Sequence, residues 1–146
     1  PDWRVNGVHS ELHSALSNLI TNALRYTPAG GTVRVSCVPT HTVQGVQCHI
    51  AVADSGCGIA QEHLPRLTER FYRVSASRRR GSDGQDYSGT GLGLAIVKHI
   101  MLRHGGELKI ASQLGQGSTF TLVLPLVLPI VSPSVQGSFK SEAQHN

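Results

Sequence analysis

The chain's 146 residues, 39 % of them hydrophobic, suit a single domain with one core of ordinary depth. Its net charge of +4 owes much to Arg78, Arg79 and Arg80, a run that fits a solvated loop, an acidic partner, nucleic acid or nucleotide phosphates. The three cysteines form no C-x-x-C pair, which argues against a disulfide framework or a zinc site and fits reducing, cytoplasmic surroundings. The longest apolar stretch, 120–131, is shorter than the roughly 20 residues that span a bilayer.

The first third of the chain predicts a helix followed by a hairpin. A short edge strand is expected over residues 3–5, and a strongly periodic helix over residues 9–26 ends at the stop signals Pro28, Gly30 and Gly31. Two half-buried strands should follow, with residues 40–45 as their turn. The apolar residues that alternate in these strands are Val33, Val35 and Cys37 in the first and Val46, Cys48, Ile50 and Val52 in the second.

The rest of the chain predicts a short helix near residues 61–66, a helix over 91–104 and a closing hairpin formed by 107–112 and 118–124. Residues 74–90 contain almost no apolar side chain, and a loop of that length is often an active-site lid or a disordered insert. Residues 126–146 are rich in Ser, Gln and Pro, so we expect a disordered tail there.

The helix predicted over residues 9–26 has one polar face. Asn18, Asn22 and Arg25 fall together on a helical wheel, with Tyr26 at the border. Asparagine is a mediocre helix former, so two of them at i and i+4 are either solvated amides or a functional pair. An amide oxygen is a hard ligand that suits Mg²⁺ bound together with phosphates. The apolar side carries Leu12, Ala15, Leu16, Leu19, Ile20, Ala23 and Leu24.

Asp54 follows the second strand of the predicted hairpin. It continues the even-numbered apolar series of that strand, so its carboxylate should point inward, where it needs a partner. That partner is either the backbone of the following turn or a ligand such as a purine amino group. Gly56 and Gly58 come next, and glycine permits close approach of a ligand to the backbone, although Asp-x-Gly-x-Gly alone is weak evidence.

A second glycine-rich segment precedes the helix predicted over residues 91–104. Free backbone N–H groups and the positive end of a helix dipole make such a segment a ready phosphate site, although an ordinary glycine-rich turn is the alternative. The spacing is neither that of a P-loop nor that of a dinucleotide fold. The segment consists of Gly89, Thr90, Gly91, Leu92, Gly93 and Leu94.

These motifs occur in an order that resembles the ATP-binding catalytic domain of sensor histidine kinases, within the superfamily that includes gyrase, the ninety-kilodalton heat-shock chaperone and a mismatch-repair ATPase. Residues 18–28 resemble the N box, 54–58 the first glycine box, 69–73 the F box and 89–93 the second glycine box, with a weaker last box at 115–117. The resemblance covers about residues 4–125. Residues 64–74 are especially similar to phosphate-regulon sensor kinases.

The resemblance implies a Bergerat-type α/β (α+β) fold, which is a two-layer sandwich with helices on one face of a mixed, mostly antiparallel sheet. ATP would lie between the long helix and a lid at about 74–90. Residues 1–125 would form the catalytic domain and residues 126–146 the tail.

The resemblance also implies roles for individual residues. Asn22 would ligate Mg²⁺ with support from Asn18, while Arg25 and Arg73 would neutralise phosphate charge during phosphoryl transfer. Asp54 would accept a hydrogen bond from the adenine amino group. The remaining contacts to ATP would come from Tyr26, Gly56, Gly58, Ile59, Phe71, Gly89, Thr90, Gly91, Leu92, Gly93, Leu94 and Thr119.

The partners implied by the resemblance are the protein's own dimerisation and histidine-phosphotransfer domain, which would form the homodimer, and a response regulator. The fragment alone is expected to be a monomer that binds no nucleic acid, in the cytoplasm, with the full-length protein in the bacterial inner membrane. The segment that begins at His9 is superficially similar to the phosphoacceptor motif of the family. In the family, however, that histidine is followed directly by an acid and lies in a separate helical hairpin, so His9 is not expected to accept phosphate.

Two other functions compete with the histidine kinase. In a stand-alone ATPase of the superfamily, a glutamate one turn before the magnesium asparagine activates the attacking water. This chain has Asn18 there, and an amide is a poor general base. The second competitor is a non-catalytic module that binds a nucleotide or a partner, or uses its arginines on nucleic acid, but the complete motif set and the lack of aromatic residues among the arginines argue against it.

Overall fold

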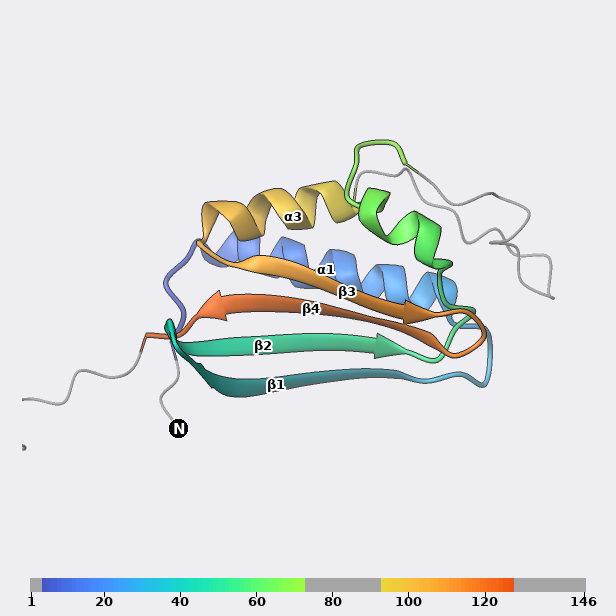
Figure 1. Ribbon diagram of the computed structural model, residues 1–146, viewed down its shortest axis with the longest axis horizontal. Coiled ribbons are helices and arrows are strands. Elements are labelled where there is room, and N and C mark those ends of the chain that lie inside the picture. The colour runs from blue at the N-terminus through green and yellow to red at the C-terminus, as the bar shows by residue number, and fades with distance from the viewer. Residues whose placement is uncertain (1–3, 73–92, 128–146) are drawn as a thin grey trace, which may run out of the picture.

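The computed structural model describes residues 4–72 and 93–127, which form a sheet with helices packed on it (Figure 1). The helix α1 spans His9–Tyr26 and is followed by the strands β1 (Val33–Thr42) and β2 (Gly45–Asp54). A short 3-10 helix, η1 (Gln61–Arg66), and the helix α3 (Gly93–Arg103) precede the strands β3 (Glu107–Gln113) and β4 (Gly117–Pro125). The predicted order of helices and strands is therefore confirmed.

The four strands form one sheet in the order β1-β2-β4-β3. All three strand pairs are antiparallel, so the parallel component expected of a mixed sheet is not found among the described strands. The turn predicted at 40–45 is shorter than expected, because β1 extends to Thr42, whose hydroxyl accepts from the backbone N–H of Gln44 at 3.1 Å. Pro39 lies within β1, which its place at the sheet edge allows.

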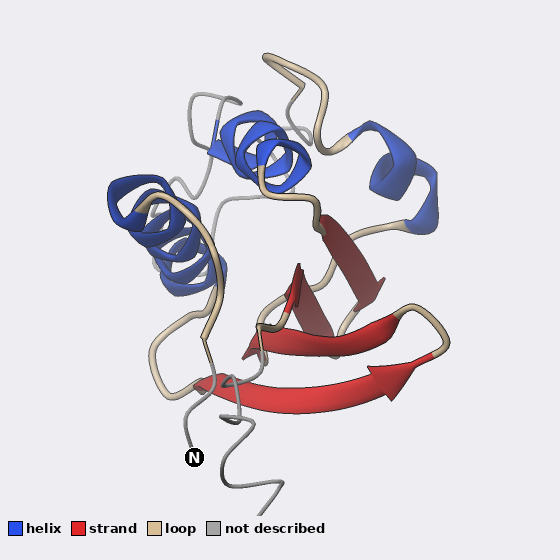
Figure 2. Ribbon diagram, turned by 90° about the vertical axis from the view of Figure 1, so that its left-hand side faces the viewer, coloured by secondary structure: helices blue, strands red, loops and turns tan. Residues whose placement is uncertain are grey.

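Helices α1 and α3 cover one face of the sheet, as the end-on view shows (Figure 2). The core lies between the two layers and contains the largest fully buried side chains. These are Leu19 from α1, Val52 from β2, Val97 and Met101 from α3, and Phe120, Leu122 and Leu124 from β4. The two-layer sandwich expected from the sequence is thus confirmed.

Three apolar residues expected on buried faces are exposed, namely Leu24, Val35 and Cys37. Leu24, near the end of α1, is 61 % exposed because it lies at the margin of the apolar stripe that Ala15, Leu19 and Ala23 bury. Val35 is 49 % exposed although it pairs with buried Val52, because the edge strand β1 has little helix above it. The periodicity of apolar residues therefore predicted the correct helices and strands, but not how many residues of each are buried.

The ends of the described chain meet beside the sheet. Arg4 forms an isolated antiparallel bridge with Val127, and the N–H of Leu126 donates to the carbonyl of Val46 at 2.9 Å. Residues 126 and 127, predicted to begin the tail, are therefore hydrogen-bonded to the rest of the fold. The predictions for Trp3, for the loop at 74–90 and for residues 128–146 lie outside the described residues.

Candidate functional site

A pocket of about 460 Å³ opens where α1, the turn after β2, η1 and the start of α3 meet. Helix α1 contributes Asn22 and Tyr26 to its wall, and Phe120 of β4 also lines it. The other lining residues are Cys57, Gly58, Ile59, Ala60, Glu62, His63, Leu67, Leu94 and Leu114. The wall is thus mainly apolar with a few polar groups, which is typical of a small-molecule site.

Asp54 is buried at the end of β2, with 7 % of its surface exposed. Its Oδ1 accepts from the N–H of Gly56 at 2.9 Å, whereas its Oδ2 is buried without a hydrogen-bond partner. Burial raises the pKa of Asp54, and backbone hydrogen bonds from Gly56 and Ser118 offset part of this rise. The inward orientation predicted from strand parity is confirmed.

Gly56 and Gly58 are required by the protein's own packing. A Cβ on Gly56 would lie 2.1 Å from the carbonyl oxygen of Tyr26, and one on Gly58 would lie 2.1 Å from that of Gln113. Gly58 also has a φ of 75°, in the left-handed region that favours glycine. Both glycines therefore let the turn pack closely against α1 and β3, and Gly58 also lines the pocket. That they let a nucleotide base approach stays a prediction.

Two serines that the sequence analysis did not single out organise the base of the site. Ser118 pairs with Asp54 across β2 and β4 and is 6 % exposed. Its hydroxyl lies 2.7 Å from that of Ser112, which accepts from the N–H of Ile59 at 2.7 Å. Ser112 thus fixes the turn that carries Ile59 into the pocket wall.

Thr119 was expected to contact the nucleotide, which stays a prediction, but the buried residue in this part of β4 is its neighbour Ser118. Thr119 pairs with Ala53 and Ala111, and neighbouring residues of a strand point to opposite faces of the sheet. Its side chain therefore lies on the face opposite to those of Asp54 and Phe120.

Three buried side-chain polar atoms lack a hydrogen-bond partner in the described part of the chain: Asn22 Nδ2, Asp54 Oδ2 and His63 Nε2. Asn22 and His63 line the pocket, and Asp54 precedes the turn that forms one of its walls. Buried polar atoms are rarely left unpaired in native proteins, so these three atoms are candidate contacts for a polar ligand.

Asn18 lies beside the N-terminus of α3, where the described chain resumes. Its Nδ2 donates to the carbonyl oxygen of Ser14 at 2.8 Å, and its Oδ1 lies 3.0 Å from where a Cβ on Gly93 would be. Asn18 therefore presents its amide oxygen at the start of α3, where the sequence predicted a phosphate site. Leu94, one residue further on, lines the pocket.

The remaining predicted site residues have different locations. Arg25 is exposed and does not line the pocket. Phe71 is 69 % exposed with a φ of 65°, and the structure does not bring it to the pocket wall. The residues whose predicted roles lie outside the described ranges are Arg73, Gly89, Thr90, Gly91 and Leu92.

Among the residues in the described ranges, no cluster of three or more His, Cys, Asp or Glu side chains could hold a metal ion alone. The amides of Asn18 and Asn22 fit Mg²⁺ in another way, because this ion commonly takes one or two protein oxygens and completes its shell with phosphates and water. Asn18 engages its Nδ2 with Ser14, which leaves its oxygen for such a role.

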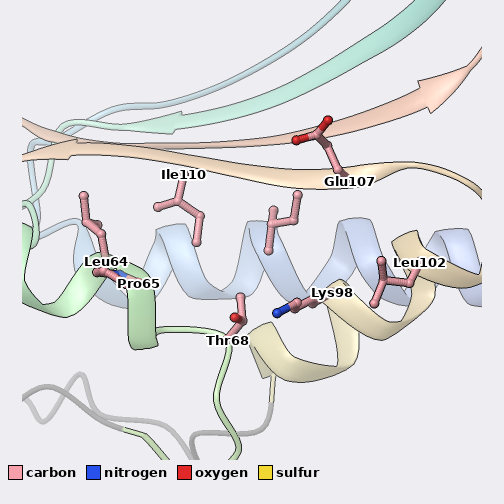
Figure 3. A pocket seen from close by; sticks show the side chains of 8 residues that line it. Leu64, Pro65, Thr68, Lys98, Leu102, Glu107 and Ile110 are labelled. Carbon is pink, nitrogen blue, oxygen red and sulfur yellow. The ribbon is translucent and has the colours of Figure 1, made fainter.

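A second depression of about 370 Å³ lies between η1, α3 and β3 (Figure 3). Leu64 and Pro65 of η1 lie on one side of it and Ile110 of β3 on another, with Lys98 and Leu102 from α3. Its two charged lining residues, Lys98 and Glu107, have no buried side-chain atom that lacks a hydrogen-bond partner. We assign no function to this depression.

The fold and the pocket define an α+β sandwich with a ligand site between its helices and one end of its sheet. A model of the family described as "Histidine kinase-, DNA gyrase B-, and HSP90-like ATPase" matches residues 7–128. The chain belongs to this family, and it is the catalytic domain of a sensor histidine kinase.

Curated relatives include sensor kinases of several bacteria. The chain is 49 % identical over 121 residues to the phosphate regulon sensor protein PhoR of Pseudomonas aeruginosa and 44 % identical over 123 residues to the sensor-like histidine kinase SenX3 of Mycolicibacterium smegmatis. These matches cover 83 % and 84 % of the chain but only 25 % and 30 % of the two relatives. The chain thus corresponds to about a quarter to a third of their length.

Solved structures show the same fold. The mycobacterial sensor histidine kinase MprB superposes with a TM-score of 0.68 at 31 % identity, covering 85 % of this chain and 76 % of that one. Full-length ShkA, solved in complex with AMPPNP, gives a TM-score of 0.61 at 28 % identity and covers 83 % of this chain and 22 % of that one. No helix among residues 4–72 and 93–127 is long and apolar enough to cross a membrane.

Proposed function

We propose that this domain binds Mg-ATP in the 460 Å³ pocket and transfers the γ-phosphate to a histidine of a separate dimerisation and phosphotransfer domain. The observation that carries the proposal is the unpartnered, buried Oδ2 of Asp54. An adenine amino group is a donor that would satisfy this oxygen, and the matching family model is described as that of an ATPase.

The residues around the pocket supply the other requirements of phosphoryl transfer, which are positioning and charge stabilisation. Tyr26 and Ile59 offer apolar surface to the base. Asn22, with Asn18, would hold Mg²⁺ through amide oxygens, and the ion would neutralise charge on the phosphates. Arg25 and Arg73 would add positive charge near the phosphates.

The partners follow from the same proposal. The relatives are sensor kinases, so the phosphoacceptor domain would lie in the same protein and form the homodimer, and a response regulator would receive the phosphate next. The domain would then work in the cytoplasm as part of a protein in the bacterial inner membrane. Similarity to PhoR favours a phosphate-responsive system.

Calorimetric titration of the chain with ATP, with and without Mg²⁺, tests the binding proposal. Asp54→Ala should abolish adenine-nucleotide binding, because Oδ2, which has no partner among the described residues, is the proposed acceptor for the adenine amino group. Thermal unfolding checks that the domain stays folded without the Oδ1 bond to Gly56. Unchanged ATP affinity in this variant would remove Asp54 from the site.

A stand-alone ATPase is the alternative within the family, and Asn18 decides against it. Its Nδ2 is held by Ser14, and neither end of an amide serves as a general base for water. Asn18→Glu should raise phosphate release if the position itself supports hydrolysis. Rapid phosphate release by the wild-type chain would favour the ATPase instead.

A further inference from the structure

His63 is fixed in the pocket wall by one of its two ring nitrogens. Its Nδ1 is hydrogen-bonded to the hydroxyl of Tyr72, and its Nε2 is buried without a hydrogen-bond partner. The carboxylate oxygen Oε2 of Glu62 lies 3.9 Å from this nitrogen, beyond hydrogen-bonding distance. The Glu62 side chain is 75 % exposed, whereas that of His63 is 14 % exposed.

The proton positions on His63 follow from these neighbours. A neutral imidazole carries one N–H, and the ring nitrogen without it accepts a hydrogen bond. In the tautomer with the proton on Nε2, the nitrogen that lies 3.9 Å from the Glu62 carboxylate, Nδ1 accepts from the Tyr72 hydroxyl. In that tautomer the pocket wall contains an N–H donor for which the described residues provide no acceptor.

Tyr72 is itself held in place before any ligand arrives. The Arg66 guanidinium lies 4.4 Å from the centre of the Tyr72 ring, a cation–π distance. Glu69 Oε1 accepts from Arg66 Nε at 3.2 Å and from Nη2 at 3.1 Å. This chain of contacts sets the orientation of the His63 ring.

We propose that His63 is a further nucleotide-binding residue, whose Nε2–H donates to an acceptor atom of the nucleoside part of ATP, and that Tyr72 is its positioning residue. The proposal rests on the proposed function of the pocket. Two other residues of the pocket wall, Ile59 and Leu67, are apolar and suit a base or ribose, and the carboxylate of Glu62 beside His63 disfavours phosphates. A purine and its ribose carry several oxygen and nitrogen acceptors.

Two substitutions test the roles of the two ring nitrogens of His63 separately. His63→Asn places an amide atom where Nδ1 lies and can still accept from Tyr72, but it has no atom at Nε2. His63→Gln places an amide N–H where Nε2 lies and loses the contact with Tyr72. We expect His63→Asn to bind both ATP and ADP about five- to tenfold more weakly, since one ligand hydrogen bond is lost, and His63→Gln to stay within about twofold of wild type.

Tyr72→Phe tests the positioning role. In the wild-type background, this substitution should weaken ATP binding about threefold, because the His63 ring loses the hydroxyl that orients it. In the His63→Gln background it should have no further effect, because the glutamine does not contact the Tyr72 hydroxyl. A purely structural role for Tyr72 would give the same loss in both backgrounds. Thermal unfolding of each variant checks that the fold is retained.

Nuclear magnetic resonance of the histidine ring nitrogens gives a test that needs no substitution. On addition of ATP to the wild-type chain, the resonance of His63 Nε2 should shift more than those of the other histidine nitrogens in the described residues. Wild-type ATP affinity in His63→Asn, equal losses in the Asn and Gln variants, or a loss for ATP but not for ADP would each overturn the inference. Absence of ATP binding by the wild-type chain would instead overturn the proposed function, and this inference with it.

Discussion

Gly56 lies so close to Tyr26 that a Cβ on residue 56 would come within 2.1 Å of the Tyr26 carbonyl oxygen. This contact joins the end of α1 to the turn that follows β2. Asp54 is hydrogen-bonded through Oδ1 to the N–H of Gly56, and Asn22 on the pocket wall lies one turn before Tyr26. The contact therefore links the two segments that carry these residues. Residues that are distant in the sequence meet because one position lacks a side chain.

We therefore expect Gly56→Ala to destabilise the domain by at least about 2 kcal/mol, because the added methyl group overlaps backbone that cannot rotate away. Gly115→Ala is the matched control. A Cβ at Gly115 meets nothing within 4 Å, so that substitution should cost only the strain of its φ of 80°, about 1 kcal/mol. Urea unfolding of the two variants measures the difference, and equal losses would mean that the contact with Tyr26 relaxes freely.

Ionised Asp54 should lower the stability of the nucleotide-free domain. Burial raises the pKa of Asp54 above its unfolded value of 3.8, so the folded state binds more protons between the two pKa values. The free energy of unfolding contributed by this group is therefore highest below pH 3.8 and falls as the pH rises through the folded-state pKa.

Asp54→Asn removes this titration while keeping an oxygen for the N–H of Gly56. We expect the variant to gain stability relative to wild type at neutral pH, and we expect this advantage to shrink as the pH is lowered towards about 4. Urea unfolding of both proteins across this range provides the measurement. A difference that does not change with pH would contradict the assigned pKa direction.

The sequence predicted the elements and the orientation of Asp54 because both depend on local periodicity. It also contained the signal for Ser118, since Phe120, Leu122 and Leu124 define the inward face of β4 and Ser118 has the same parity. Thr119, which lies between Ser118 and Phe120, has the parity of the opposite face of the sheet.

Other features depend on contacts between distant segments and leave no local pattern. The carbonyls that require Gly56 and Gly58 to be glycine belong to Tyr26 and Gln113. The exposure of Val35 follows from its place on an edge strand, which periodicity does not reveal. His63 gave no signal, because its role depends on the contact with Tyr72 and on burial.

Cys57 offers a chemical footprint of the pocket. It is exposed and lines the pocket, whereas Cys37 is exposed on β1 outside it. Partial burial raises the pKa of Cys57 and the Asp54 charge raises it further, while burial raises the pKa of Cys48 to about 12 and keeps that thiol protonated. Saturating Mg-ATP should slow alkylation of Cys57 but not that of Cys37, as read by peptide mass spectrometry, and equal rates with and without nucleotide would place ATP elsewhere.

Asn22→Ala should separate function from stability. Among residues 4–72 and 93–127, the Nδ2 of Asn22 has no hydrogen-bond partner, and alanine is the better helix former. The free energy of unfolding should therefore be unchanged or raised by about 0.5 kcal/mol. Mg²⁺-dependent ATP binding and phosphate transfer should be lost. Thr21→Ala, at an exposed position of the same helix, is the control and should retain both activities; equal behaviour of the two variants would make Asn22 a structural amide.

Transfer of labelled γ-phosphate from ATP to a separately supplied helical-hairpin domain bearing a phosphoacceptor histidine tests the central claim most directly. The account predicts Mg²⁺-dependent labelling of that domain by the wild-type chain, little free phosphate, and no labelling by Asp54→Ala or Asn22→Ala. Tight ATP binding without labelling of any such domain, or release of the label as free phosphate, would contradict it.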